Sequence, residues 1–248
     1  MRRYIVAGIV LFAMFLVVFA PAGLLKQLLS PLQGVELQSP TGTLWRGSAD
    51  LYLADLPAGL VDWSFRPATI LKGSLGYHVR LSGPDHALTA DVAAAPSRIT
   101  LSAEGSFDSQ YLNPWMAPYE IGLGGEIRLD DVALSVFTAV SERDAASPAL
   151  APGEASGSLH WTGGNVRYRL SGQSYSGNLP PLVAVLGEGL EAYVYPRDEQ
   201  TPLLRAQLLD NGFIKIGITR LLTRLLNNPW PGSDADHETV LEVEEQLF

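Results

Sequence analysis

Leu75-Gly-Tyr-His-Val-Arg-Leu-Ser82 is the stretch that decides the fold. Its large apolar residues stand at every second position, so an extended chain would present one apolar side and one polar side. This pattern is typical of a strand in an antiparallel sheet that has one face in water. The same alternation returns in Ile99–Glu104, Val166–Ser171 and Ile214–Thr219. We therefore expect a mainly β protein built on antiparallel sheet.

Turns and short helices divide the strands. Three turn motifs between alternating stretches predict hairpins: Ser82–Asp85, Thr162–Asn165 and Asp210–Gly212. At Asp130-Asp131 the alternation changes register, which predicts a β-bulge or a tight bend. Short helices are expected at Pro67–Lys72, Pro181–Leu186 and Thr219–Leu226.

So many one-sided strands with so few helices leave an apolar sheet face that must close on itself or on something else. A curved, taco-like antiparallel sheet satisfies that requirement, and we expect it over residues 35–248. The Ala- and Pro-rich stretch at residues 142–154 is a candidate boundary between two lobes. Glu238–Phe248 is expected to be a final edge strand protected from aggregation by its carboxylates, with a free tail as the alternative.

The amino-terminal stretch Tyr4–Leu25 contains 22 residues without a charge. A helix of that length spans roughly 33 Å, enough for a bilayer core of about 30 Å. Arg2 and Arg3 precede it, so the positive-inside rule leaves residues 1–3 in the cytoplasm and places residues 26–34, a linker, and the β domain on the far side. A cleaved signal peptide ending near Ala20-Pro21-Ala22 is an alternative, but the apolar run is longer than usual for one. A buried core helix is disfavoured because no face is polar.

Charge and composition exclude several functions. Removing Arg2 and Arg3 from the 17 basic residues leaves 15 against 26 acidic ones, a net charge of −11. Nucleic acid and an anionic bilayer surface are therefore not expected as main partners. The chain has no cysteine, which excludes a cysteine nucleophile and a disulfide.

Catalytic and metal-binding motifs are weak. None of the four histidines has a second ligand at metal spacing: His78, His86, His160 and His237. Gly172–Gly177 only approaches a nucleophile elbow, because serine replaces its second glycine. The acidic cluster of Asp234, Asp236 and Glu238 lacks the spacing of a calcium loop and is interpreted as solvated. We expect no enzyme, no cofactor and no metal.

The most informative motif is Thr41-Gly42-Thr43-Leu44-Trp45-Arg46-Gly47, followed by a strand with Trp63 and by Leu71-Lys-Gly73-Ser-Leu75. In this order behind an apolar stretch, the motifs resemble the type II secretion system protein N family. The residues that the resemblance singles out, for structural or partner contacts, are Thr41, Gly42, Leu44, Trp45, Gly47, Trp63 and Gly73. Gly42 and Gly47 flank Trp45, which lets the backbone bend around a large ring. Trp45 and Trp63 are then core anchors or partner contacts.

The resemblance implies a single-pass protein of the bacterial inner membrane, with a cytoplasmic amino terminus and a periplasmic β domain. It implies an accessory or scaffold role in type II protein secretion, without enzymatic activity. The implied partners are other inner-membrane platform proteins, with membrane lipid around the amino-terminal helix. Two alternatives remain open: a lipid-handling protein with an apolar β groove like those of AsmA-like proteins, motivated by the one-sided strands, and a periplasmic hydrolase.

Overall fold

The computed structural model describes residues 2–29, 34–139, 149–170, 172–209, 213–232 and 235–246. Its helices are α1 (Arg2–Val18), α2 (Gly23–Leu29), α3 (Asn113–Met116) and α4 (Arg220–Leu225). Its 3-10 turns are η1 (Pro67–Lys72), η2 (Ser109–Leu112), η3 (Ala117–Tyr119) and η4 (Glu188–Leu190). The strands are β1 (Val35–Gly42), β2 (Arg46–Leu53), β3 (Leu56–Arg66), β4 (Leu75–Gly83), β5 (His86–Ala95), β6 (Arg98–Asp108), β7 (Gly122–Leu123), β8 (Glu126–Ala139), β9 (Ala149–Trp161), β10 (Gly164–Leu170), β11 (Gln173–Leu179), β12 (Leu182–Gly187), β13 (Glu191–Pro196), β14 (Leu204–Leu208), β15 (Phe213–Thr219) and β16 (Thr239–Gln246).

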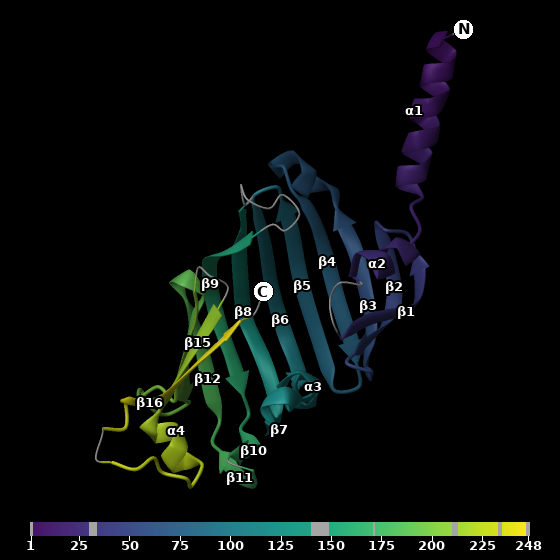
Figure 1. The fold of residues 1–248 in the computed structure, drawn as a ribbon. Coiled ribbons are helices and arrows are strands. Elements are labelled where there is room, and N and C mark those ends of the chain that lie inside the picture. The colour runs from purple at the N-terminus through teal and green to yellow at the C-terminus, as the bar shows by residue number, and fades with distance from the viewer. Residues whose placement is uncertain are drawn as a thin grey trace.

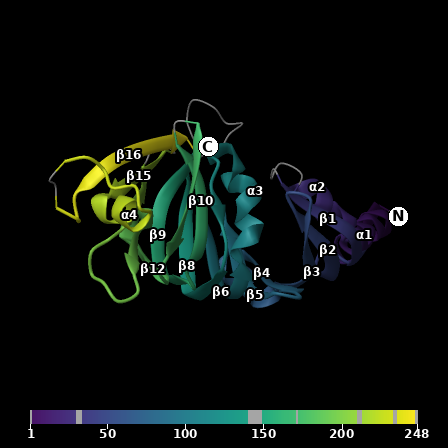
Figure 2. The same ribbon diagram turned by 90° about the horizontal axis from the view of Figure 1, so that it is seen from below.

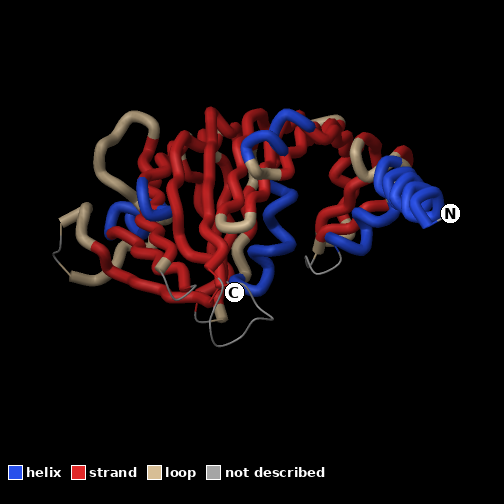
Figure 3. Tube along the Cα trace, turned by 90° about the horizontal axis from the view of Figure 1, so that it is seen from above, coloured by secondary structure: helices blue, strands red, loops and turns tan. Residues whose placement is uncertain are grey.

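A single antiparallel sheet dominates the molecule. It has 13 strands in the order β1-β2-β3-β4-β5-β6-β8-β9-β12-β13-β14-β15-β16, and β7, β10 and β11 form a separate three-stranded sheet. The large sheet curves, and the short helices around α3 lie on its concave side together with β10 (Figures 1 and 2). Strands make up most of the chain, and helices are few and peripheral (Figure 3). The sheet does not close, so β1 and β16 are its two edges in the described part of the chain.

One row of laterally paired residues is apolar, or glycine, on every strand of the large sheet from β2 to β16. The row runs Ala49, Val61, Leu81, Leu88, Gly105, Leu129, Leu159, Ala184, Val194, Leu204, Ile218 and Leu241. His86 is two residues before Leu88 and its ring packs against Tyr111 of η2, which places the helical segment over this face. Exposure rises along the row from 1% at Ala49 to 39% at Leu241.

The predicted strand Leu75–Ser82 is confirmed as β4, and the hairpin at Ser82–Asp85 joins it to β5. The predicted irregularity at Asp130-Asp131 is also confirmed, because the β8–β9 register shifts there and Asp131 has a φ of 48°. The helical turn at Pro67–Lys72 is η1, and α4 lies within the predicted Thr219–Leu226. The carboxyl-terminal strand is present as the edge strand β16.

The continuous helix predicted over Tyr4–Leu25 is wrong. Helix α1 ends at Val18, and a second short helix, α2, begins at Gly23. Pro21 has no amide hydrogen to continue a helix, and the peptide groups beside it bond to the sheet instead. Within the described residues, no helix has both the length and the apolar character that crossing a membrane requires.

The short helix predicted at Pro181–Leu186 is also wrong, because Leu182–Gly187 is strand β12 between β9 and β13. The apolar run is only six residues long and contains two valines, whose branched side chains favour a strand. The predicted hairpin at Thr162–Asn165 does not form. Gly163 and Gly164, with φ values of 81° and 147°, carry the chain out of the large sheet and into the small one.

Parts of other predictions fall outside the described residues. Ala149–Glu154, expected in a surface loop and lobe boundary, belong to strand β9, while residues 142–148 are not described. Lys26–Leu29, expected in the linker, lie in α2, and residues 30–33 are not described. The turn at residues 210–212 lies outside the described residues, although the strands on either side of it pair as predicted.

Candidate interface at the helix–sheet junction

The motif Thr41–Gly47 lies where the amino-terminal helices meet the sheet. We call this region the junction (residues 17–22, 41–47, 63–65 and Tyr77). Two backbone hydrogen bonds join the two parts. Leu44 N donates to Ala20 O at 2.8 Å, and Ala22 N donates to Gly42 O at 3.3 Å. Pro21 and Thr43 form an isolated antiparallel bridge. The segment after α1 is therefore held like an added strand against the motif.

Trp45 joins α1 to the aromatic side chains of the sheet. Its indole Nε1 donates to the carbonyl oxygen of Val17, in the last turn of α1, at 2.7 Å. Its ring packs edge to face on Phe65 with centroids 4.9 Å apart, and Phe65 in turn contacts Tyr77 at 5.4 Å. Edge-to-face pairs of this kind each add about 1 kcal/mol beyond the area they bury. The helix end is thus fixed by both a hydrogen bond and aromatic packing.

Trp63 is the buried centre of the junction, with 5% of its surface exposed. Its Nε1 donates to the carbonyl oxygen of Thr43 at 3.1 Å, which satisfies the only polar atom of the ring. Gly47 lies opposite, and a Cβ added there would stand 2.6 Å from the ring and 2.3 Å from the carbonyl oxygen of Thr41. The close approach of the indole to the backbone therefore requires glycine at this position.

Gly42 has a different reason to be glycine. Its φ is 88°, in the left-handed region, and an added Cβ would lie 2.5 Å from the carbonyl oxygen of Arg46. Next to it, the hydroxyl of exposed Thr41 lies 3.0 Å from that of Ser48, across the β1–β2 pair. Both residues shape the turn between β1 and β2.

The structure brings together six of the seven predicted residues and leaves the seventh apart. Gly73 ends η1 with a φ of 73°, and an added Cβ would meet nothing within 4 Å. It terminates a helical turn by adopting the left-handed conformation and takes no part in the junction. The order of motifs along the sequence therefore does not describe one spatial cluster.

The sequence was compared with known protein families, curated proteins and solved structures. The family model of the type II secretion system protein N matches residues 33–213. The chain belongs to the type II secretion system protein N family. No curated protein and no solved structure matches it. The family match contains strands β1 to β14, and it includes the motif side of the junction but not α1, α2 or β16.

The hydrophobic cluster beneath the junction extends the family motif to the amino-terminal helices. Its buried members are Ala22, Leu37, Ala49, Val61 and Trp63. Leu25 and Leu29 of α2 pack against this cluster from the concave side of the sheet. Residue types alone provide no reason to assign Ala20-Pro21-Ala22 to the core, since small residues there also fit a cleavage pattern. Phe65 and Tyr77 can be assigned to the apolar side of the sheet from the sequence, because both belong to runs with an apolar residue at every second position.

A charged network lies on the opposite, polar face of β3–β5. The Asp91 carboxylate contacts His78 Nδ1 at 2.9 Å and Arg66 at 3.0 Å. Burial acts to raise the pKa of Asp91, but the hydrogen bond from His78 and the charge of Arg66 outweigh it, so the pKa lies below its usual value. At the junction, burial alone raises the pKa of Tyr77. These are structural interactions of partly exposed groups.

The weak catalytic and metal-binding motifs of the sequence lie on separate elements in this member of the protein N family. No three histidine or carboxylate side chains among the described residues are grouped closely enough to hold a metal ion. Asp236, from the predicted acidic cluster, is instead ion-paired with Arg224 at 2.7 Å, and Asp234 lies outside the described residues. Ser174 and Ser176 lie on strand β11, which is followed by a strand and not by a helix. An open pocket of about 350 Å³ beside Asp91 is lined by ion-paired side chains that include Arg66, Arg98 and Glu154.

Proposed function

We propose that this chain is an accessory scaffold component of type II protein secretion in the inner membrane. In this proposal α1 is the anchor, the amino terminus is cytoplasmic and the curved sheet is periplasmic. The sheet makes protein–protein contacts with other inner-membrane platform proteins. Family membership supports involvement in type II secretion and contact with its other components, because the family is one of secretion-system components.

The observation that carries this proposal is the junction. Every side chain from Arg3 to Phe19 is exposed, and those after Arg3 are apolar or glycine apart from the tyrosine hydroxyl of Tyr4. Lipid would stabilise such a surface, because apolar side chains gain free energy when they leave water. Trp45 and the Pro21–Thr43 bridge then fix the direction in which the sheet leaves the anchor. A scaffold needs this property, since the position of its contact surfaces depends on a rigid connection.

Two measurements test the proposal. A strain lacking the gene should secrete type II substrates poorly, and the full-length chain should copurify with platform proteins after gentle extraction. Normal secretion together with copurification of no platform component would contradict the scaffold role. Protease added to spheroplasts should digest the β domain and leave a small amino-terminal fragment. Complete protection of the β domain would place it in the cytosol and contradict the topology.

A lipid-handling function is the second candidate, and the apolar row across the sheet favours it. From Leu81 onwards the side chains of this row are only half-buried, so apolar surface is left partly in contact with water. An acyl chain lying along the concave side would cover it. Native mass spectrometry of gently extracted protein should then detect bound phospholipid, and its absence would remove this candidate.

A further inference from the structure

The two edges of the large sheet differ in how the chain protects them. An edge strand exposes unpaired backbone N–H and C=O groups, which pair readily with another strand unless the edge is blocked. We call the edge formed by β1 the β1 rim and the edge formed by β16 the β16 rim. They lie at opposite ends of the curved sheet (Figures 1 and 2).

The β1 rim is blocked by its own chain. The β1–β2 register is irregular between Gln38 and Thr41, where Ser39 has a φ of 49° and Pro40 has no amide hydrogen. At the end of this strand, Gly42 O already accepts a hydrogen bond from Ala22 N. Helix α2 also packs against β1. A regular strand cannot be added along this edge.

The β16 rim has none of these features in its described residues. Strand β16 runs for eight residues without proline and pairs with β15 in regular register from Phe213–Gln246 to Ile218–Leu241. Its other edge has no strand partner in the described part of the chain. The irregularity in this pair occurs only at its start, between Ile218 and Thr219. The backbone is therefore available to a further strand over most of its length.

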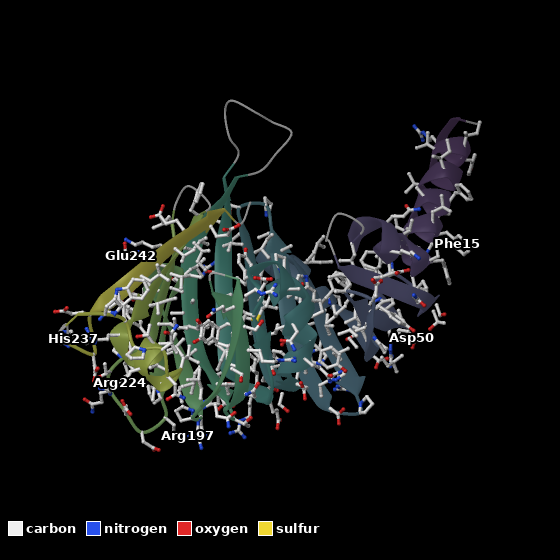
Figure 4. All side chains as sticks on the ribbon, turned by 60° about the horizontal axis from the view of Figure 1, so that its bottom comes forward. Phe15, Asp50, Arg197, Arg224, His237 and Glu242 are labelled. Atoms are coloured by element: carbon white, nitrogen blue, oxygen red, sulfur yellow. The ribbon has the colours of Figure 1, made fainter. Side chains whose placement is uncertain are left out.

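The two faces of β16 specify what that strand would look like. Leu241 and Val243 continue the apolar side of the sheet and are 39% and 40% exposed. Glu242 and Glu244 alternate with them on the polar side, where Figure 4 shows Glu242 at the outer end of the sheet. Glu242 is ion-paired with Lys215 of β15 at 3.0 Å, so this one lysine stands beside two exposed carboxylates that leave room for further basic partners. Residues directly opposite on neighbouring strands interact, and opposite charges stabilise the pair.

We propose that the β16 rim binds an extended segment of a partner protein as an added strand, with basic side chains opposite Glu242 and Glu244 and apolar side chains opposite Leu241 and Val243. The proposal deepens the contact function proposed above and rests on it. A second copy of this chain is a poor occupant, because pairing two β16 strands brings carboxylates into opposition. Backbone hydrogen bonds supply affinity in this mode of recognition, and the alternating side chains supply selectivity.

Synthetic peptides test the edge directly. An acetylated peptide of alternating valine and lysine should bind the full-length, detergent-solubilised chain and slow amide hydrogen exchange within residues 239–246. The same peptide with glutamate in place of lysine should bind at least about tenfold more weakly. No binding, or slowed exchange confined to other strands, would overturn the proposal.

Charge-reversed variants separate strand addition from general attraction to an acidic protein. The double variant Glu242→Lys/Glu244→Lys, on the polar side of β16, should weaken binding of the lysine peptide by about tenfold. The control Asp50→Lys/Asp62→Lys makes the same change in net charge at exposed positions on β2 and β3, and it should bind normally. Figure 4 shows Asp50 near the other end of the sheet. Equal losses in both variants would show that only net charge matters and would overturn the proposal.

Copurification distinguishes failure of the β16 proposal from failure of the scaffold function. If the wild-type chain captures platform proteins and the β16 variant captures them equally, the β16 proposal fails and the scaffold function stands. If the wild-type chain captures none, the scaffold function fails, and the peptide experiment still decides whether the edge accepts a basic strand.

Discussion

The β1 rim and the β16 rim terminate one sheet, but the chain treats them differently. At the β1 rim the protein uses two helices, a bulge, a proline and two tryptophans to bury apolar surface and occupy the edge. At the β16 rim it leaves a regular strand with exposed glutamates and half-exposed apolar residues. The first arrangement stabilises the fold and couples it to α1. The second contributes little to stability and leaves an edge that a partner can use.

Replacing the buried tryptophan of the junction is the most severe test of this difference. Trp63→Ala should lower the free energy of unfolding by about 3–5 kcal/mol, because it removes a large buried ring and leaves a cavity. The control Trp230→Ala, at a partly exposed position near the β16 rim, should cost about 1 kcal/mol or less. Urea unfolding followed by circular dichroism measures both. Equal losses would show that the junction is not the more strongly packed end.

Two glycines with similar backbone angles separate crowding from conformation. Gly42→Ala should cost about 2–4 kcal/mol, because a left-handed residue acquires a Cβ that collides with the Arg46 carbonyl oxygen. Gly73→Ala meets open space and should cost about 1 kcal/mol for its left-handed φ alone. Thermal unfolding of the two variants gives the difference. If Gly73→Ala were the more damaging, crowding at the junction would not be the cause.

Trp45→Phe tests the coupling of α1 to the sheet. The variant keeps an aromatic ring over Phe65 but removes the donor to Val17 O, so it should cost about 1 kcal/mol and loosen the helix. Spin labels at positions 7 and 50 should show a broader distance distribution. The control Trp161→Phe also loses one indole hydrogen bond, to Gly124 O, and should leave that distribution unchanged. An unchanged distribution in Trp45→Phe would mean that the indole does not orient the helix.

The alternating strands of this fold were predicted better from the sequence than its amino-terminal helices were. Period-two alternation is a local property, so β4, β6 and β15 could be located from side-chain order alone. The bulge at Asp130-Asp131 was visible for the same reason, since a register change moves every later side chain to the other face. The expectation of a large curved antiparallel sheet followed from the scarcity of helices.

The predictions that proved wrong have a different cause, because each of these features depends on contacts with residues distant in the sequence. The helix break after Val18 is stabilised by hydrogen bonds to Gly42 and Leu44, which hydropathy cannot reveal. The turn at Gly163-Gly164 looks like a hairpin until the pairing of β9 with β12 is known. Motif order likewise grouped Gly73 with the junction, although only tertiary structure shows that it lies apart.

The polar face near the junction provides a smaller test, based on pH. The pKa of Asp91 is lowered in the folded state, so its stabilising effect is present above its unfolded pKa of about 4 and is lost as pH falls further. Because the pair is partly exposed, the effect should stay below about 1 kcal/mol. Thermal unfolding of Asp91→Asn should therefore match the wild-type protein near pH 3 and be slightly less stable at pH 6. A constant difference across this range would assign the effect to packing and not to charge.

The smallest expected effect is at the β16 rim and completes the comparison. Glu244 and Glu245 are exposed, so Glu244→Gln/Glu245→Gln should change the free energy of unfolding by no more than about 0.5 kcal/mol. The two changes should largely cancel, since Glu244 loses its attraction to Lys215 directly across the strand pair, whereas Glu245 lies opposite Ile214 and only adds negative charge to a protein of net charge −9. Urea unfolding measures it. A loss above 1 kcal/mol would show that these carboxylates serve the fold, as the tryptophans do at the β1 rim. A neutral or stabilising result, together with weakened peptide binding, would mean that the chain keeps charges on this edge for contact with another molecule.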